Sequence, residues 1–144
     1  MYLVDTNVIS EAAPSRLAAR RELVDWMDRH STSLYLSVVT VTEIEAGISR
    51  ARREQAARKA ANLTAWLETV LHLYGDRVLA FDTETARVAG TLSDRARSRG
   101  QPAGMADIII AATAKYRAFT VLTRNLRHFS PLGVAAVDPF AALP

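Results

Sequence analysis

Near its N-terminus the sequence runs Tyr2-Leu3-Val4-Asp5-Thr6-Asn7-Val8-Ile9, and this stretch indicates the fold class. Its first three residues are apolar with β character, so they predict a buried strand that presents Asp5 at its C-terminal end. Asp5, Thr6 and Asn7 then supply side chains that can cap a short helical turn. A buried strand that leads directly into a helix indicates an α/β fold.

The same alternation of strand and helix continues along the chain. Further strands are predicted at residues 34–39, 78–81, 119–122 and 134–137. Helices are predicted at about 16–29, after a cap at Thr40 or Thr42, at 53–73, at 82–98 and at 105–117. Strands separated by helices predict a mostly parallel sheet of about five strands with helices on both faces. We find no repeat or long linker, so residues 1–144 are expected to form a single domain.

Composition excludes several classes of site and suggests a compartment. The chain has no cysteine, which excludes disulfides, thiolate metal sites and cysteine nucleophiles and agrees with a reducing cytoplasm. It has no signal-peptide pattern and no run near the ~18 apolar residues of a membrane helix. The net charge is +3, and Lys59 and Lys115 are the only lysines. An arginine-rich chain suits a nucleic-acid partner, although a GC-rich genome produces the same bias.

Polar side chains are predicted to meet at one rim of the sheet. In open parallel sheets, ligands bind beyond the carboxyl ends of the strands. Asp5 follows the first strand, and Thr123-Arg124-Asn125 follows the fourth. Glu43 and Asp107 lie near the starts of helices, which face the same rim. We therefore expect these side chains to converge, although they are far apart in sequence.

Carboxylates gathered in one pocket repel each other unless a cation neutralises them. Oxygen ligands without histidine or cysteine suit Mg²⁺ or Mn²⁺, which activates bound water and screens phosphodiester charge. Each acid also has a simpler interpretation. Asp5 could only cap a helix and Glu43 could be an exposed helix residue. Asp107 is harder to explain in this way, because it precedes the apolar run Ile108-Ile109-Ile110 and a carboxylate there needs a partner.

Four motifs in order resemble those of PIN-domain proteins, and most closely the VapC/FitB-like toxins of bacterial type II toxin–antitoxin systems. They are Val4-Asp5-Thr6-Asn7-Val8-Ile9-Ser10-Glu11, Thr42-Glu43-Ile44-Glu45-Ala46-Gly47-Ile48, Ala106-Asp107-Ile108-Ile109-Ile110-Ala111-Ala112 and Val121-Leu122-Thr123-Arg124-Asn125. The resemblance extends from the first strand to about Phe129. It implies a PIN fold, a homodimer, a cognate antitoxin, and endonucleolytic cleavage of RNA with Mg²⁺ or Mn²⁺.

The resemblance also assigns roles to individual residues. It implies that Asp5, Glu43 and Asp107 bind the metal, and that the hydroxyls of Thr6 and Thr123 support these ligands. Asn125 joins the catalytic set, but many relatives carry an acid there, so the number of metals stays open.

Other polar residues near these motifs are expected to lie outside the metal ligands. Glu11 follows Asp5 closely but is left out of the ligand set. Glu45 should point away from Glu43, because residues two apart on a helix do not share a face. His128 is expected at the surface or in packing, with a water-positioning role as the alternative.

Three other functions compete with this interpretation. A haloacid-dehalogenase-type phosphohydrolase needs a second aspartate where this chain has Asn7. A receiver domain needs an acidic pair near the start of the chain and a lysine directly after a late strand, and neither is present. A PIN-like module that binds RNA or an antitoxin without cutting remains the alternative, although such a module need not keep a repulsive acidic cluster.

The tryptophans suggest a partner surface. Trp26 and Trp66 lie on two predicted helices that carry more apolar residues than one face needs. Large aromatic residues on surface helices often anchor interfaces. Resemblance to the toxin family implies that these helices form a groove for an antitoxin segment. We therefore expect at least one of the two side chains to be exposed in the free subunit.

Overall fold

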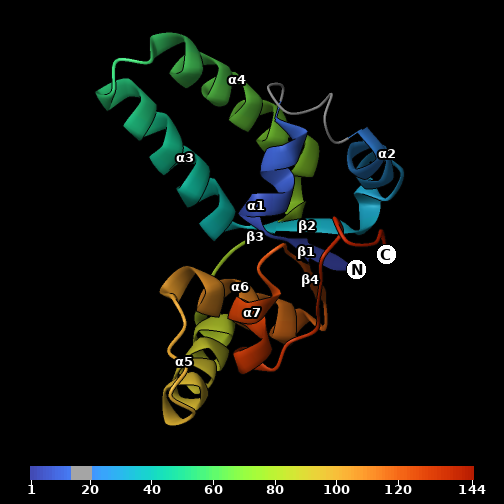
Figure 1. Ribbon diagram of the computed structural model, residues 1–144, viewed down its shortest axis with the longest axis vertical. Helices are drawn as coiled ribbons and strands as arrows, with labels where there is room; N and C mark the ends of the chain where they lie inside the picture. Colours follow the sequence, from blue (N-terminus) through green and yellow to red (C-terminus); the bar gives the residue numbers. More distant parts are fainter. Residues whose placement is uncertain (14–20) are drawn as a thin grey trace.

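The structure is a computed structural model that describes residues 1–13 and 21–144. Within these ranges five strands form a parallel sheet in the order β3-β2-β1-β4-β5 (Figure 1). Their bounds are β1 Tyr2–Val4, β2 Leu34–Ser37, β3 Val78–Leu79, β4 Thr120–Leu122 and β5 Ala136–Val137. The predicted parallel α/β sheet is thus confirmed.

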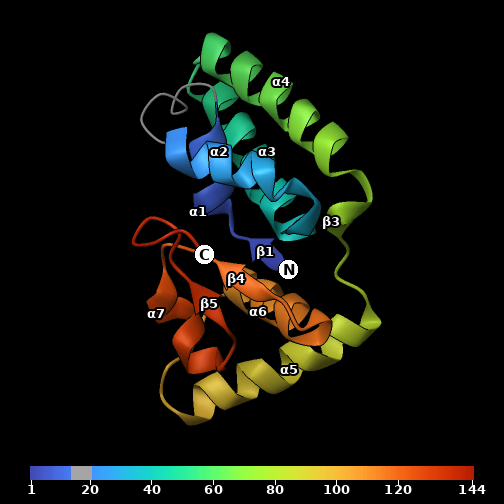
Figure 2. The same cartoon turned by 90° about the vertical axis from the view of Figure 1, so that its right-hand side faces the viewer.

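Helices cover both faces of this sheet, as predicted (Figures 1 and 2). One face carries α1 Thr6–Ile9, α2 Arg21–Arg29, α3 Val38–Arg53 and α4 Ala57–Tyr74. The other carries α5 Thr83–Ser98, α6 Met105–Arg117 and α7 Leu126–Phe129. Single turns of 3₁₀ helix lie at Ser10–Ala12, Ser31–Ser33, Gly75–Arg77 and Ser130–Leu132. No helix in the described ranges is long and apolar enough to cross a membrane.

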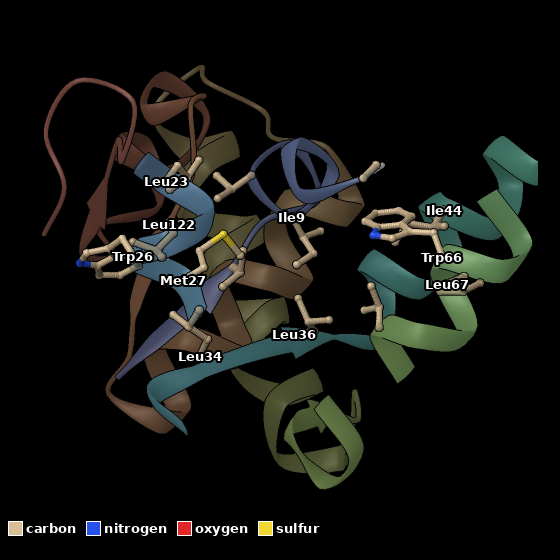
Figure 3. Packing of buried hydrophobic residues seen from close by; sticks show 14 of the residues in the cluster. Ile9, Leu23, Trp26, Met27, Leu34, Leu36, Ile44, Trp66, Leu67 and Leu122 are labelled. Atoms are coloured by element: carbon tan, nitrogen blue, oxygen red, sulfur yellow. The ribbon is translucent and has the colours of Figure 1, made fainter. Parts of the chain in front are cut away.

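Alternation along the central strands divides the core into two clusters. Val4 and Leu122 pack with α1 to α4, whereas Leu3 and Val121 pack with α5 to α7. Successive side chains of a strand point to opposite faces, so each central strand contributes to both clusters. Figure 3 shows the first cluster, which joins the sheet to the α3–α4 pair. Because both faces are buried, the strands consist mainly of apolar residues.

The structure corrects several predicted boundaries. The third strand ends at Leu79 rather than at residue 81, and the fifth begins at Ala136 rather than at residue 134. The second strand ends at Ser37, and residues 38–39 already belong to α3. The Ser37 hydroxyl accepts a hydrogen bond of 3.2 Å from the Val39 amide, so this residue caps the helix in place of Thr40 or Thr42. The chain turns between α3 and α4 at residues 54–56, so α4 begins at Ala57 rather than near residue 53.

The expectation of an exposed tryptophan is wrong for the isolated subunit. Trp26 is 4% exposed and Trp66 8% exposed, and both belong to the first core cluster (Figure 3). Trp26 packs edge-on against Tyr2 and stacks on His30, and its indole N–H donates to the Pro144 carbonyl at 3.2 Å. Part of the predicted helix 16–29 lies outside the described residues.

Candidate active site

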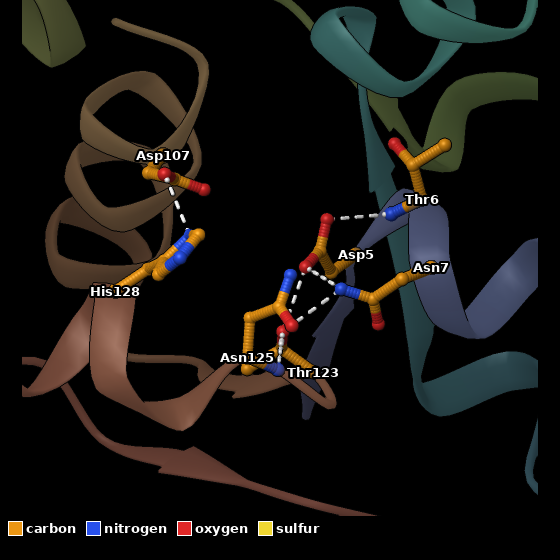
Figure 4. Close-up of polar contacts among 7 residues, drawn as sticks. All are labelled: Asp5, Thr6, Asn7, Asp107, Thr123, Asn125 and His128. Atoms are coloured by element: carbon orange, nitrogen blue, oxygen red, sulfur yellow. Dashed lines mark hydrogen bonds and ion pairs between the residues drawn. The ribbon is translucent and has the colours of Figure 1, made fainter. Parts of the chain in front are cut away.

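Asp5 is the most constrained acid of the predicted cluster. It directly follows β1 and is 6% exposed. Its Oδ1 accepts a 2.7 Å hydrogen bond from the Thr6 amide. Its Oδ2 accepts bonds from Asn7 Nδ2 at 2.6 Å and from Thr123 Oγ1 at 2.7 Å (Figure 4). Oδ1 is therefore oriented by the turn that follows β1, and Oδ2 is oriented both by that turn and by the residue after β4.

The electrostatic environment of Asp5 disfavours its negative charge. Burial raises the pKa of Asp5 above its usual value, and the charges of Glu43 and Asp107 act in the same direction. Hydrogen bonds from Thr123 and Thr6 oppose this rise of the pKa. A cation placed among the three acids would relieve both the burial cost and the repulsion.

Glu43 reaches the site from α3. Its side chain is exposed, and Glu43 Oε2 accepts a hydrogen bond from the Thr6 hydroxyl. The same hydroxyl lies 3.2 Å from Oγ1 of the buried Thr40. Thr6 thus connects the first turn after β1 with α3. Glu45 is also exposed, but it is not among the residues that line the cavity described below.

Asp107 approaches from the opposite side, in the first turn of α6. Its Oδ2 lies 3.2 Å from His128 Nδ1 on α7. Figure 4 shows this pair facing Asp5 across a gap. His128, whose side chain is 38% exposed, therefore lies beside a predicted ligand.

These elements line an open cavity of about 580 Å³. It is lined by Asp5, Thr6, Asn7, Ser10, Glu11, Glu43, Ala106, Asp107, Arg124, Asn125 and His128. Five of the six predicted site residues line it, and the fully buried sixth, Thr123, lies behind Asp5. Among the described residues, no three acidic or histidine side chains are close enough to hold a metal ion as they stand. Binding an ion would require the acids to close around it.

The cavity also contains polar residues that the sequence analysis did not assign to the site. Asn7 bridges the first turn and the end of β4: its Nδ2 donates to Thr123 Oγ1 at 3.2 Å, and its Oδ1 accepts from the Arg124 amide at 3.1 Å. Glu11 is buried, and its Oε1 lies 3.4 Å from Arg124 Nη2. The only sequence signal for these residues was their position within the same motifs.

Comparison with known protein families identifies the fold. The family model for the PIN domain matches residues 2–132. The chain belongs to the PIN domain family. Its relatives include the plasmid stability protein StbB of Pseudomonas syringae pv. tomato, which is 36% identical over 99% of this chain and 100% of the relative. Toxin FitB of Neisseria gonorrhoeae is 35% identical over 97% and 99% of the two chains.

A third relative and a solved structure extend the comparison. The VapC ribonuclease Y4jK of Sinorhizobium fredii is 34% identical, covering 97% of this chain and 98% of its own. The crystal structure of FitAcB from Neisseria gonorrhoeae superposes with a TM-score of 0.84 and 34% identity, over 97% of this PIN-domain chain and 99% of that chain. The likeness therefore covers nearly the whole chain.

Proposed function

We propose that this PIN-domain protein is a metal-dependent endoribonuclease and the toxin of a type II toxin–antitoxin pair. The observation that carries the proposal is that Asp5, Glu43 and Asp107, from three separate elements, line one cavity. The family membership and the relatives named as toxin and ribonuclease support it. A silent binding module is the weaker candidate, because it gains nothing from burying Asp5 among like charges.

The donor chemistry of the cavity fits Mg²⁺ or Mn²⁺. Asp5, Glu43 and Asp107 would hold the ion, and Asn125 would add a neutral amide oxygen. The bound ion would lower the pKa of a coordinated water and offset the charge of the phosphodiester. The raised pKa of Asp5 supports a cation here, since a nearby positive charge would favour its ionised form.

The chain's own residues orient these ligands before any ion binds. Thr123 and Asn7 hold Asp5 Oδ2, and Thr6 holds Glu43. Hydrogen bonds of this kind fix a ligand's direction, so Asp5 and Glu43 are each oriented, although the acids must still close around the ion. We assign this chemistry to one nuclease domain formed by residues 1–144.

The proposed partners are RNA as substrate, a second copy of the chain and a cognate antitoxin, acting in the cytoplasm. Similarity to the relative named Toxin FitB supports an antitoxin partner. A cavity of about 770 Å³ between α2 and α4 is the proposed binding site for an apolar segment of the antitoxin. It is lined in part by Met27, Trp66, Val70 and Leu73. Trp66 contributes to this lining although only 8% of it is exposed.

RNA cleavage by the purified chain tests the enzymatic proposal. Labelled single-stranded RNA is incubated with the protein in EDTA, Mg²⁺ or Mn²⁺. The variant Glu45→Gln, which changes an exposed acid outside the cavity, serves as the control for loss of activity unrelated to the site. We expect internal cleavage only with a divalent ion, at equal rates in both proteins. Absence of cleavage under every ion, with the protein folded, would favour the silent module. Cleavage in EDTA would contradict the metal dependence.

A further inference from the structure

Arg124 is held at the edge of the acidic cavity by two contacts on different sides. Its Nη2 lies 3.4 Å from Glu11 Oε1. Its Cζ lies 3.9 Å from the centroid of the Phe140 ring, so the ring covers one face of the guanidinium. Its backbone amide donates to Asn7, which fixes the main chain at the same point. The side chain is therefore restrained before any substrate arrives.

These contacts leave part of the guanidinium available. The Arg124 side chain is 43% exposed, whereas that of Glu11 is only 7% exposed. A guanidinium has five N–H donors in a planar fork, and the Glu11 contact involves one end of that fork. The exposed donors can therefore bind a second oxyanion, such as a phosphate, in a bidentate manner.

The position of Arg124 fits a negatively charged substrate. An RNA strand that enters the cavity must pass carboxylates at Asp5, Glu11, Glu43 and Asp107. Arg124 is the only lysine or arginine among the described residues that line this cavity. A fixed cation at the rim would offset the repulsion between these acids and the RNA backbone.

The C-terminal segment after β5 holds Phe140 in place. Asp138 Oδ1 accepts a 2.9 Å hydrogen bond from the Phe140 amide. At the end of the segment, the Pro144 carbonyl accepts from the Trp26 indole at 3.2 Å. Figures 1 and 2 show this segment returning past the sheet towards the N-terminus. The first bond folds the segment locally before the ring that stacks on Arg124, and the second attaches the segment to α2 beyond that ring.

We propose that Arg124 binds an RNA phosphate next to the scissile one, and that Phe140 is a positioning residue that holds the guanidinium for this contact. The inference rests on the proposed ribonuclease function and adds a substrate-binding residue to it. The class of ligand is a single-stranded polynucleotide backbone, recognised through its phosphate rather than its bases.

Binding of RNA without catalysis tests the role of Arg124. The affinity for single-stranded oligo-uridine is measured in EDTA over a series of salt concentrations. Each phosphate contact contributes about 0.7 to the slope of log K against log salt for single strands. We expect Arg124→Gln to lower the slope by about this amount, and the control Arg87→Gln, exposed on α5, to leave it unchanged.

Steady-state kinetics with the divalent ion separate positioning from general structure. Phe140→Ala should raise KM several-fold with little change in kcat. The substitution should displace the Arg124 guanidinium and leave the acidic side chains of the cavity in place. Phe140→Tyr should restore KM, whereas Phe140→Leu, apolar but without a π face, should not. Melting temperatures of the three variants show whether each is folded. Equal KM values for the leucine and tyrosine variants would overturn the stacking role.

The outcomes keep this inference distinct from the proposed function. If wild-type protein cleaves RNA while Arg124→Gln keeps its salt slope and KM, the phosphate contact is wrong and the nuclease stands. If wild-type protein never cleaves, the nuclease proposal fails, and the slope in EDTA still decides whether Arg124 contacts the RNA backbone.

Discussion

The Thr123 hydroxyl donates a 2.7 Å hydrogen bond to Asp5 Oδ2, although 118 positions separate the two residues in the chain. The parallel pairing of β1 with β4, in which Val4 lies opposite Leu122, brings their next residues together. The sheet register therefore determines the direction of the most buried acid. A change of register would remove the site without altering any of its side chains.

Replacing Asp5 by asparagine should abolish cleavage while preserving the fold. Loss of one anionic ligand should lower the RNA cleavage rate about 100-fold or more, the cost of removing direct charge stabilisation. The melting temperature should be unchanged or higher, because burial and neighbouring acids disfavour the Asp5 charge. Cleavage assays and thermal melts check both. A fully active Asp5→Asn protein would remove the basis for the metal site.

The same substitution should change the pH dependence of stability. The pKa of Asp5 is raised in the folded chain above the ordinary value of 3.8. Its stabilising contribution is therefore fully present below about pH 3.8 and is lost as the pH rises through the raised native pKa. In EDTA, any advantage of Asp5→Asn over wild type at pH 7 should shrink as the pH falls to 4. An advantage that grows on acidification would contradict the direction of the shift.

The fold was largely predictable because its signals are local, and the errors lie where local signals compete. Residues 38–39 are both valine, which favours a strand, yet they form the first turn of α3. The helix starts early because the Ser37 hydroxyl satisfies a free amide there. The exposure of the tryptophans was predicted wrongly, because an amphipathic pattern does not show how much of a helix's apolar face is covered by neighbouring elements.

The site was predictable to the extent that strand ends and helix starts meet at one rim. That rule brought Asp5, Glu43 and Asp107 to one cavity. It could not identify Asn7, which in the sequence resembles a helix-capping residue and whose partners lie at the end of β4. It also could not assign Arg124, because its ring partner Phe140 lies beyond the recognised motifs.

Asn125→Asp should leave the enzyme active and tighten metal binding. Asn125 is exposed on the cavity wall. Its backbone N–H donates to Thr123 Oγ1 at 3.0 Å, so the backbone stays fixed when the side chain changes. A carboxylate there adds a charged oxygen ligand to the three existing acids. Calorimetric titration of Mn²⁺ into both proteins measures the change. Several-fold weaker Mn²⁺ binding would mean that the side-chain amide of Asn125 acts by donating a hydrogen bond.

Asn7→Ala should impair both stability and catalysis, because Asn7 connects the turn after β1 to the segment after β4. The variant loses a donor to Asp5 and leaves the Arg124 amide without its side-chain acceptor. We expect the free energy of unfolding to fall by about 1–3 kcal/mol. The cleavage rate should fall about 10- to 100-fold, as for other residues that orient metal ligands. Asn62→Ala, an exposed asparagine on α4, is the matched control and should change neither quantity. Wild-type cleavage by Asn7→Ala would show that Thr123 and the Thr6 amide suffice to orient Asp5.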